Sequence, residues 1–470
     1  MMTENAVVEP LVAEVPFDAM RALKSSSKPP EKTYCIGSKY WRFNEKLGEW
    51  VEISRPILEL VLKDDEKLCP YTGDGPDAFL SPLEREVKRV TMDNQVIYAG
   101  PLAGYSMGLK NFDGQRALVT SDMDLIEPRR GDFPTLRRVF EGAFVTHDRD
   151  GVVIHDQRPY LFGWWQHSLR CLYFGPHSGG LALFLCGERK SGKTLTSNLI
   201  RQTLGKRFAR PYPFMAGKDN FNEELFEAVV QWIDDENAET HFAARLKFGA
   251  AIKQMVAADG SRMRGMHQKA RALRPLWRLL VNLNMEPDRL MIIPPLEDDV
   301  VDKMLILKAE KRDMPMPARS PEERAAFWKV LTGELPSFVW WLLNEFTLPD
   351  ELKERFGVRH WCHPEVEMEL RDISPEQHLL EFIERWFRRH PGKYFEGTAS
   401  DLRQALLTDG GLSRAEESEV QIPVYIGRRL RKLKEQYPLK YAEKRTGNGV
   451  KWTIQSIAPE ASLSDEEVEL

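Results

Sequence analysis

Residues 183–194 read Leu-Phe-Leu-Cys-Gly-Glu-Arg-Lys-Ser-Gly-Lys-Thr, and this segment is the most informative part of the sequence. Its apolar beginning predicts a buried strand, and residues 195–204 after it can form a helix. Between the two lies Gly-x-x-x-x-Gly-Lys-Thr, the pattern of a phosphate-binding loop (P-loop) in the strand–loop–helix setting that it requires. The sequence therefore predicts a nucleoside triphosphate site, with ATP and Mg²⁺ as the expected cofactors.

Each part of the P-loop has an expected role. Glycines let backbone N–H groups turn towards the β- and γ-phosphates, the Lys193 ammonium adds a positive charge there, and the Thr194 hydroxyl can ligate Mg²⁺. The expected nucleotide contacts are the eight residues of the loop: Gly187, Glu188, Arg189, Lys190, Ser191, Gly192, Lys193 and Thr194.

A second predicted strand, 228–233, ends in the carboxylates that such a site needs: Asp234, Asp235 and Glu236. We assign Asp235 to the metal, together with Thr194, and Glu236 to the general base that polarises the attacking water. Asp234 is the alternative metal ligand. An acidic turn after a strand is common in isolation, and the P-loop before it favours the functional interpretation.

A basic segment and a third strand follow a predicted helix at 241–257. Asp259-Gly260 predicts a turn, and the next residues offer cations to a nucleic-acid backbone, with a solvated basic loop as the alternative. The third strand, 277–284, ends in Asn284, which can orient the attacking water or simply end the strand. The cations of the segment are Arg262, Arg264, His267, Lys269 and Arg271.

In this order, the P-loop, the acidic strand, the basic hairpin and the Asn284 strand resemble the superfamily 3 helicases, and most closely the ATPase module of phage and poxvirus-type primase–helicases. The resemblance covers roughly residues 98–348. It implies an AAA+ core that assembles as a homo-hexameric ring around DNA and binds ATP at subunit interfaces. It also implies that the hairpin grips single-stranded DNA in the pore, with His267 and Lys269 as the first contacts and Arg262 and Arg264 behind them.

One position departs from the family pattern. In the family an arginine after the Asn strand reaches the ATP site of the neighbouring subunit, whereas here Lys303 is nearest to that place and Arg289 lies upstream. Because such arginines are typically worth about 10³–10⁵ in turnover, a lysine favours a slower enzyme. Lys303 is the expected substitute.

The segment 373–455 predicts a DNA-binding winged helix. A capped helix at 398–407, a basic helix at 424–434 and two short strands joined by Asn-Gly follow one another in the order of that fold. A protein-binding role is the alternative. The expected duplex contacts on the helix are Arg428, Arg429, Arg431 and Lys432, and those on the wing are Lys444, Arg445 and Lys451.

Composition and length complete the domain plan. The chain has 470 residues, a net charge of −5 and five scattered cysteines, which argues against a disulfide scaffold and requires any DNA contact to come from local basic patches. No apolar run is long enough to cross a bilayer, so we expect a cytoplasmic protein with no membrane partner. The expected parts of this α/β protein are a disordered tail (1–32), an α+β region (33–150), the ATPase core (151–313), a helical lid with its linker (314–372, with helices at 321–332 and 335–346), the winged helix (373–455) and an acidic tail (456–470).

Two further patterns carry weaker signals. Asp122 and Asp124 have the Asp-x-Asp form that primase–polymerases use for metal, but no matching partners are evident in this short region. The run from His360 to His363 contains metal-binding residue types without a fourth ligand nearby, which favours a packed loop.

The combined expectation is an ATP-dependent DNA helicase that serves the replication of a phage, a virus or an integrated element. It would act on single-stranded and duplex DNA, with a separate primase or polymerase as a further possible partner. The alternatives are a DNA-binding replication initiator or loader with a slow ATPase switch, and an AAA+ ATPase that remodels protein.

Overall fold

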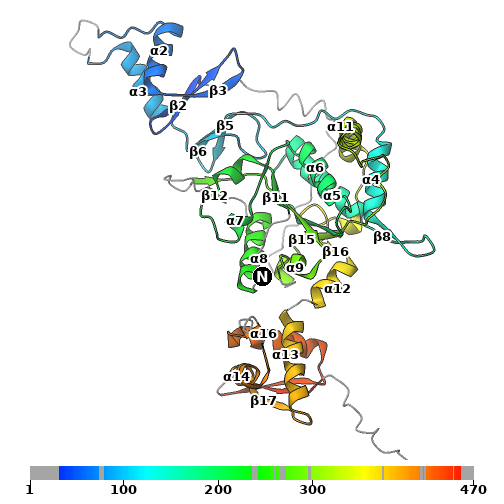
Figure 1. Ribbon diagram of the computed structural model, residues 1–470. Coiled ribbons are helices and arrows are strands. Elements are labelled where there is room, and N and C mark those ends of the chain that lie inside the picture. The colour runs from blue at the N-terminus through cyan, green and yellow to red at the C-terminus, as the bar shows by residue number, and fades with distance from the viewer. Residues whose placement is uncertain are drawn as a thin grey trace, which may run out of the picture.

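The computed structural model describes residues 31–72, 79–234, 242–257, 261–263, 271–294, 298–372, 375–412, 416–417, 420–447 and 449–456. The expected tails at 1–30 and 457–470 lie outside these residues. Along the chain come an N-terminal α+β unit, a central α/β core and a C-terminal α/β unit (Figure 1). One large hydrophobic cluster fills the core from Tyr98 to Leu370, and a separate one fills the C-terminal unit.

The core is built on a six-stranded sheet in the order β10-β11-β14-β9-β15-β16. Every neighbouring pair is parallel, so the carboxyl ends of all these strands lie along one edge. All residues of β9 are buried, as expected for a strand covered on both faces. The strands are β9 (Ala182–Gly187), β10 (Phe208–Ala209), β11 (Val230–Asp234), β14 (Arg278–Asn284), β15 (Met304–Lys308) and β16 (Trp361–Cys362).

Helices pack around this sheet and carry most of the aromatic core. The Phe338 ring, on α11, lies 5.2 Å from the Phe140 ring and 5.0 Å from the Trp165 ring, which ties α11 to α4 and α5. The helices are α4 (Pro134–Phe144), α5 (Arg158–Tyr173), α6 (Lys193–Thr203), α7 (Tyr212–Met215), α8 (Phe242–Ala257), α9 (Pro287–Leu290), α10 (Asp298–Val301), α11 (Pro321–Asn344), α12 (Pro364–Asp372) and the 3₁₀ helices η1 (Glu223–Glu227) and η2 (Asp350–Leu352).

The prediction of two helices between residues 321 and 346 is wrong. A capping box of Ser320 and Glu323 starts α11, which then runs without a break past Pro336. An interior proline costs one backbone hydrogen bond, but burial of side chains such as Leu335 and Phe338 on either side of it outweighs that loss. Since these side chains belong to the same hydrophobic cluster as the sheet, α11 is an integral part of the core.

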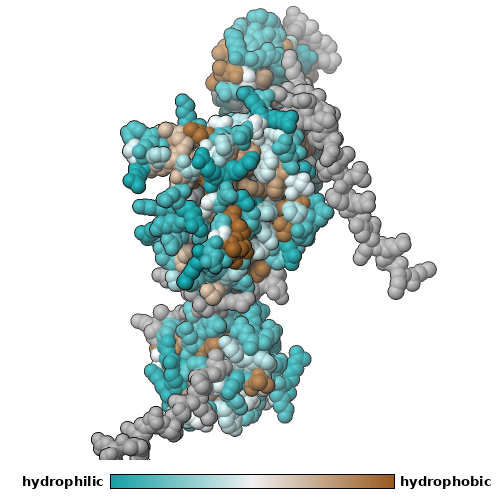
Figure 2. All heavy atoms as spheres, turned by 90° about the vertical axis from the view of Figure 1, so that its right-hand side faces the viewer, coloured by the Kyte–Doolittle hydropathy of each residue, from teal (hydrophilic) through white to brown (hydrophobic). Residues whose placement is uncertain are grey.

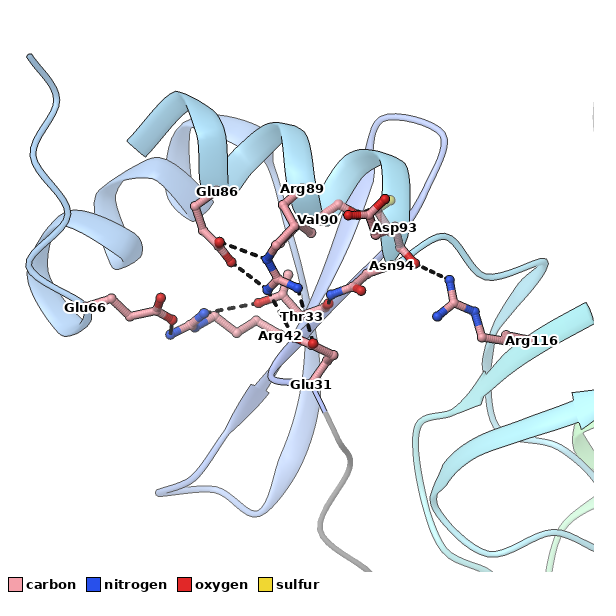
Figure 3. A network of polar contacts seen from close by, with 11 residues as sticks. Glu31, Thr33, Arg42, Glu66, Glu86, Arg89, Val90, Asp93, Asn94 and Arg116 are labelled. Atoms are coloured by element: carbon pink, nitrogen blue, oxygen red, sulfur yellow. Dashed lines mark hydrogen bonds and ion pairs between the residues drawn. The ribbon is translucent and has the colours of Figure 1, made fainter. Parts of the chain in front are cut away.

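The N-terminal unit contains a three-stranded antiparallel sheet against two helices. Arg89 joins the segment before this sheet to α3, because its guanidinium donates to both Glu31 and Glu86 (Figure 3). Arg116 donates to the Asp93 backbone carbonyl and so links α3 to the next sheet. The elements are β1 (Thr33–Ile36), β2 (Lys39–Asn44), β3 (Glu49–Ile53), α2 (Arg55–Asp65) and α3 (Pro82–Asp93), followed by the sheet β4 (Tyr98–Gly100), β6 (Gln115–Val119) and β5 (Gly108–Phe112) and the hairpin β7 (Val145–His147) and β8 (Val153–Asp156).

The C-terminal unit has its own core and a small antiparallel sheet in the order β17-β19-β18. Thr398 and Asp401 form a capping box at the start of α14, as the sequence predicts. A further helix, α13, and the strand β17 precede the predicted elements. The bounds are α13 (Pro375–Arg389), β17 (Phe395–Thr398), α14 (Ala399–Asp409), α16 (Pro423–Gln436), β18 (Tyr441–Thr446) and β19 (Gly449–Ile454).

A histidine of α5 gives the core a pH-dependent stability. Burial, with a smaller contribution from the charge of Arg278, lowers the pKa of His167 to about 4, although its ring hydrogen-bonds the Gly179 carbonyl at 2.8 Å. In the unfolded chain this histidine takes up its proton near pH 6.5. Its contribution to the free energy of unfolding is therefore fully present above that pH. The contribution is lost as the pH falls towards 4, by an amount on the order of 3 kcal/mol. We expect the unfolding midpoint, followed by tryptophan fluorescence, to fall less steeply between pH 6.5 and 4 in His167→Gln than in the wild type. Equal slopes in the two proteins would contradict this assignment.

Candidate nucleotide-binding site

The P-loop encloses its lysine. Lys193 is 8% exposed, and its ammonium donates to the carbonyls of Gly187 at 2.8 Å and Glu188 at 2.7 Å and to Ser191 Oγ at 3.4 Å. The charge is thereby held inside the concave side of the loop. A phosphate group in this loop would meet a fixed cation at the start of α6, where backbone N–H groups also point outwards from the helix.

Backbone conformation explains the glycines of the loop. Gly187 has φ +156°, and a Cβ there would come within 2.5 Å of the Ala309 carbonyl oxygen. Gly192 has φ +91° and forms the left-handed N-cap of α6. Lys190 also has a positive φ of 66°. Positive φ angles at such positions are a backbone feature by which loops turn N–H groups towards an anion.

Asn284 and the P-loop meet at the same edge of the sheet. Asn284 is the register partner of Gly187 in the parallel pair of β14 and β9. The next strand on the other side of β14 is β11, and its last residue, Asp234, is only partly buried. Thr194 is exposed in the first turn of α6. The predicted phosphate loop, amide and first carboxylate therefore lie on adjacent strands at one edge.

Asn282 is a residue of this edge that the sequence analysis missed. It is 2% exposed, donates from Nδ2 to Asp234 Oδ1 at 3.2 Å, and accepts from Ser197 Oγ at 2.8 Å. It therefore joins the acidic strand to the helix that follows the P-loop, and fixes the Asp234 carboxylate. Its place inside an apolar strand, two residues before Asn284, was the available signal, because a buried amide needs partners.

Several predicted site residues lie outside the described residues. These are Asp235 and Glu236 of the acidic strand and Arg264, His267 and Lys269 of the basic segment. The expected hairpin is present at its base, where β12 (Ser261–Met263) pairs antiparallel with β13 (Arg271–Leu273). Arg262, on β12, is exposed.

Lys303 is engaged within its own chain. It precedes β15, at the edge of the sheet opposite to the P-loop, since the first residue of β15 pairs with Ala182 at the start of β9. Its side chain is 15% exposed, and its ammonium pairs with Asp302 and lies 5.4 Å from the Phe356 ring centroid. These contacts would have to break before the ammonium could reach out. Arg289, on α9 directly after the Asn284 strand, is partly exposed.

The cations of the C-terminal unit fall into two groups. Arg429 is 2% exposed, which corrects its predicted place on a duplex-facing surface: it is spaced at helical intervals with the buried Ile426 and Leu433. Arg431 and Lys432 lie within 3.8 Å of Glu443 and 3.4 Å of Glu376, respectively. Among the predicted DNA contacts, those that are exposed and for which the described residues give no ion-pair partner are Arg428, Lys444, Arg445 and Lys451.

The Asp-x-Asp pattern has structural roles in the fold. Asp122 Oδ1 accepts from the Met107 N–H at 2.7 Å, and Asp124 pairs with Lys206 at 2.5 Å. Both carboxylates therefore stabilise loops around the β4-β6-β5 sheet. Within the described residues, neither belongs to a group of side chains that could hold a metal.

Figure 2 shows a face that is mostly hydrophilic, with small separated hydrophobic areas. In the described part of the chain, no helix has both the length and the apolar character needed to cross a bilayer.

Comparison with known proteins gives structural neighbours alone. No family model and no curated protein matches the chain. Among solved structures, the apo structure of the NrS-1 C-terminal region (305–718) has a TM-score of 0.49 at 10% identity, covering 90% of this chain and 95% of that one. The A form apo structure of the same region also has a TM-score of 0.49 at 10% identity, covering 88% of this chain and 93% of that one. Likeness at this level identifies neither a family nor an activity.

Proposed function

We propose that this protein is an ATP-dependent DNA helicase of superfamily 3 type, with an AAA+ core that works as a hexameric ring in the replication of a phage, a virus or an integrated element. One observation carries the proposal: the parallel strands β9, β14 and β11 bring Gly187, Asn284 and Asp234 to one edge, around a lysine enclosed by the P-loop. This is the arrangement that phosphoryl transfer needs, because its catalysis is mainly positioning and charge stabilisation.

In the proposed mechanism each side chain has one task. Lys193 and the loop N–H groups would hold the β- and γ-phosphates. Thr194 and Asp235 would hold Mg²⁺, whose charge would balance that of the phosphates when it is bound. Glu236 takes the proton of the attacking water, and Asn284 orients that water from the adjacent strand. Asn282 keeps Asp234 at a fixed distance from helix α6.

The proposed DNA contacts come from two places. The hairpin of β12 and β13 would carry His267 and Lys269 to a single strand, with Arg262 exposed at its base. The order α13, β17, α14, α16, β18, β19 with sheet order β17-β19-β18 supports a winged helix for the C-terminal unit. Its exposed cations would contact duplex phosphates.

Removal of two exposed cations from the C-terminal unit should weaken duplex binding. Arg428→Ala with Arg445→Ala is expected to lower duplex affinity and to reduce the slope of log affinity against log salt by about two units, about one for each lost phosphate contact. The measurement is duplex binding by fluorescence anisotropy at several salt concentrations. Arg388→Ala with Lys393→Ala is the matched control, since it removes the same charge from exposed positions on α13 and the loop after it. An equal loss in the control would show that only net charge matters.

One observation favours the alternative of a slow replication initiator or loader. Lys303 is largely buried and ion-paired, so the expected substitute for the trans-acting arginine is engaged within its own subunit. Arg289 is then the remaining candidate for that task. Strand displacement on a forked duplex separates a motor from a switch, and stimulation of ATP hydrolysis by DNA separates both from an ATPase that remodels protein.

A further inference from the structure

Three potential metal ligands gather at the carboxyl edge of the sheet, apart from the nucleotide site. Glu310 follows β15, His363 follows β16, and Glu365 lies in the first turn of α12. One ligand atom from each of these side chains lies within 4.8 Å of the others. The group therefore combines one imidazole and two carboxylates from segments far apart in the sequence.

The histidine of this group has a ring nitrogen without a hydrogen-bond partner among the described residues. His363 is fully buried, and its Nε2 atom has no hydrogen-bond partner among the described residues. The other ring nitrogen, Nδ1, accepts from the Glu365 N–H at 3.3 Å. Because Nδ1 accepts, the proton of the neutral ring lies on Nε2, and this buried N–H has no acceptor among the described residues. A cation that replaced this proton would give Nε2 a partner.

The carboxylates retain free oxygens although a lysine is close to them. Lys308 Nζ contacts Glu365 Oε2 at 2.5 Å and Glu310 Oε1 at 3.3 Å, and Glu310 Oε1 also accepts from Thr146 at 3.0 Å. In the described part of the chain, Glu310 Oε2 and Glu365 Oε1 make no hydrogen bond. The lysine thus neutralises part of the negative charge and competes with any second cation, while one oxygen of each carboxylate stays available.

We propose that His363, Glu310 and Glu365 bind a divalent transition-metal ion of the Zn²⁺ class, with water in the remaining positions. The ion would take the place of the proton on His363 Nε2; Nδ1 would then carry the ring proton and give up its hydrogen bond from the Glu365 N–H. A mixed set of imidazole and carboxylate donors suits Zn²⁺ or Co²⁺, whereas Mg²⁺ prefers oxygen donors alone. The ion would tie β15, β16 and α12 together beside the P-loop, because the chain leaving β15 is bonded to β9 through the Ala309 N–H and the Cys186 carbonyl. This inference does not depend on the proposed helicase function.

The first test is metal binding by the full chain, freed of metal with a chelator and kept without nucleotide. Co²⁺ titration followed by visible absorption should show a saturable site, and added Zn²⁺ should displace the bound Co²⁺. Glu365→Gln, a change at a half-exposed side chain that leaves the core intact, should lower Co²⁺ affinity at least about tenfold, since even changes behind the ligands typically cost that much. His360→Gln is the matched control, because this histidine lies on the same segment outside the group, and it should bind as the wild type does.

The second test uses the competing lysine. Lys308→Met removes the ammonium and should strengthen Co²⁺ binding at least about tenfold, because two carboxylates then lack their internal counter-ion. No binding in either the wild type or Lys308→Met would overturn the proposal and leave Lys308 as the only cation that these carboxylates need. Binding that Glu365→Gln leaves unchanged would overturn it equally, since the ion would then sit elsewhere.

Discussion

Lys193→Ala should reduce ATP hydrolysis at least about a hundredfold and weaken nucleotide binding, while the protein stays folded. The ammonium is the one side-chain charge that the P-loop encloses, and removal of a single preorganised donor from a site of charge stabilisation typically costs about 10²–10³ in turnover. The measurement is steady-state ATPase activity, together with binding of a fluorescent ATP analogue. The fold should survive because α6 keeps Leu199 and Ile200 in the core.

Lys329→Ala provides the matched control for this experiment. Lys329 is an exposed lysine of α11 that belongs to no predicted site, so its removal takes the same charge from the core's surface. We expect its ATPase activity to stay within a few-fold of the wild type. A Lys193→Ala protein that hydrolyses ATP at the control's rate would remove the P-loop from the mechanism.

Glu236→Gln should lower the rate of ATP hydrolysis about 10²–10⁴-fold and keep ATP binding, because the change removes a general base and leaves the metal ligand in place. Asp234→Asn should have a smaller effect on turnover, since the Asp234 carboxylate is fixed by Asn282 at 3.2 Å and serves position more than proton transfer. Single-turnover hydrolysis and ATP binding measured on both variants separate these roles. Near wild-type turnover in Glu236→Gln, with a large loss in Asp234→Asn, would reverse the assignment.

Much of the core could be predicted because the relevant signals are local. The apolar run before Gly187 and the strand that ends at Asn284 appear in the structure within one residue of their predicted ends. The basic hairpin predicted to follow Asp259-Gly260 has its paired base, and the capped helix after Thr398 starts where the cap predicts. In each case a few neighbouring residues fix the backbone.

The features that could not be predicted depend on residues distant in sequence. The continuity of α11 through Pro336 follows from packing against α4 and α5, and propensity alone argues for a break. The sequence alone does not distinguish Arg429 from the other three predicted cations of this helix. Only the fold shows that it lies on the buried side of α16. Asn282 gains its meaning only when β11 lies beside β14.

The group of His363, Glu310 and Glu365 illustrates the same limit. From the sequence, the segment 360–363 lacks a fourth ligand nearby and is best interpreted as a packed loop. The parallel pairing of β15 with β16 places Glu310 next to His363, and α12 adds Glu365. A ligand set assembled across strands leaves no spacing pattern in the chain.

The rate of ATP hydrolysis by the full chain, measured with and without single-stranded DNA, shows whether ATP turnover is coupled to DNA. A DNA motor couples chemistry to movement, so single-stranded DNA should raise the wild-type rate several-fold. The double variant His267→Ala with Lys269→Ala should keep the basal rate and lose the stimulation. A wild-type rate that is the same with and without DNA would contradict the account.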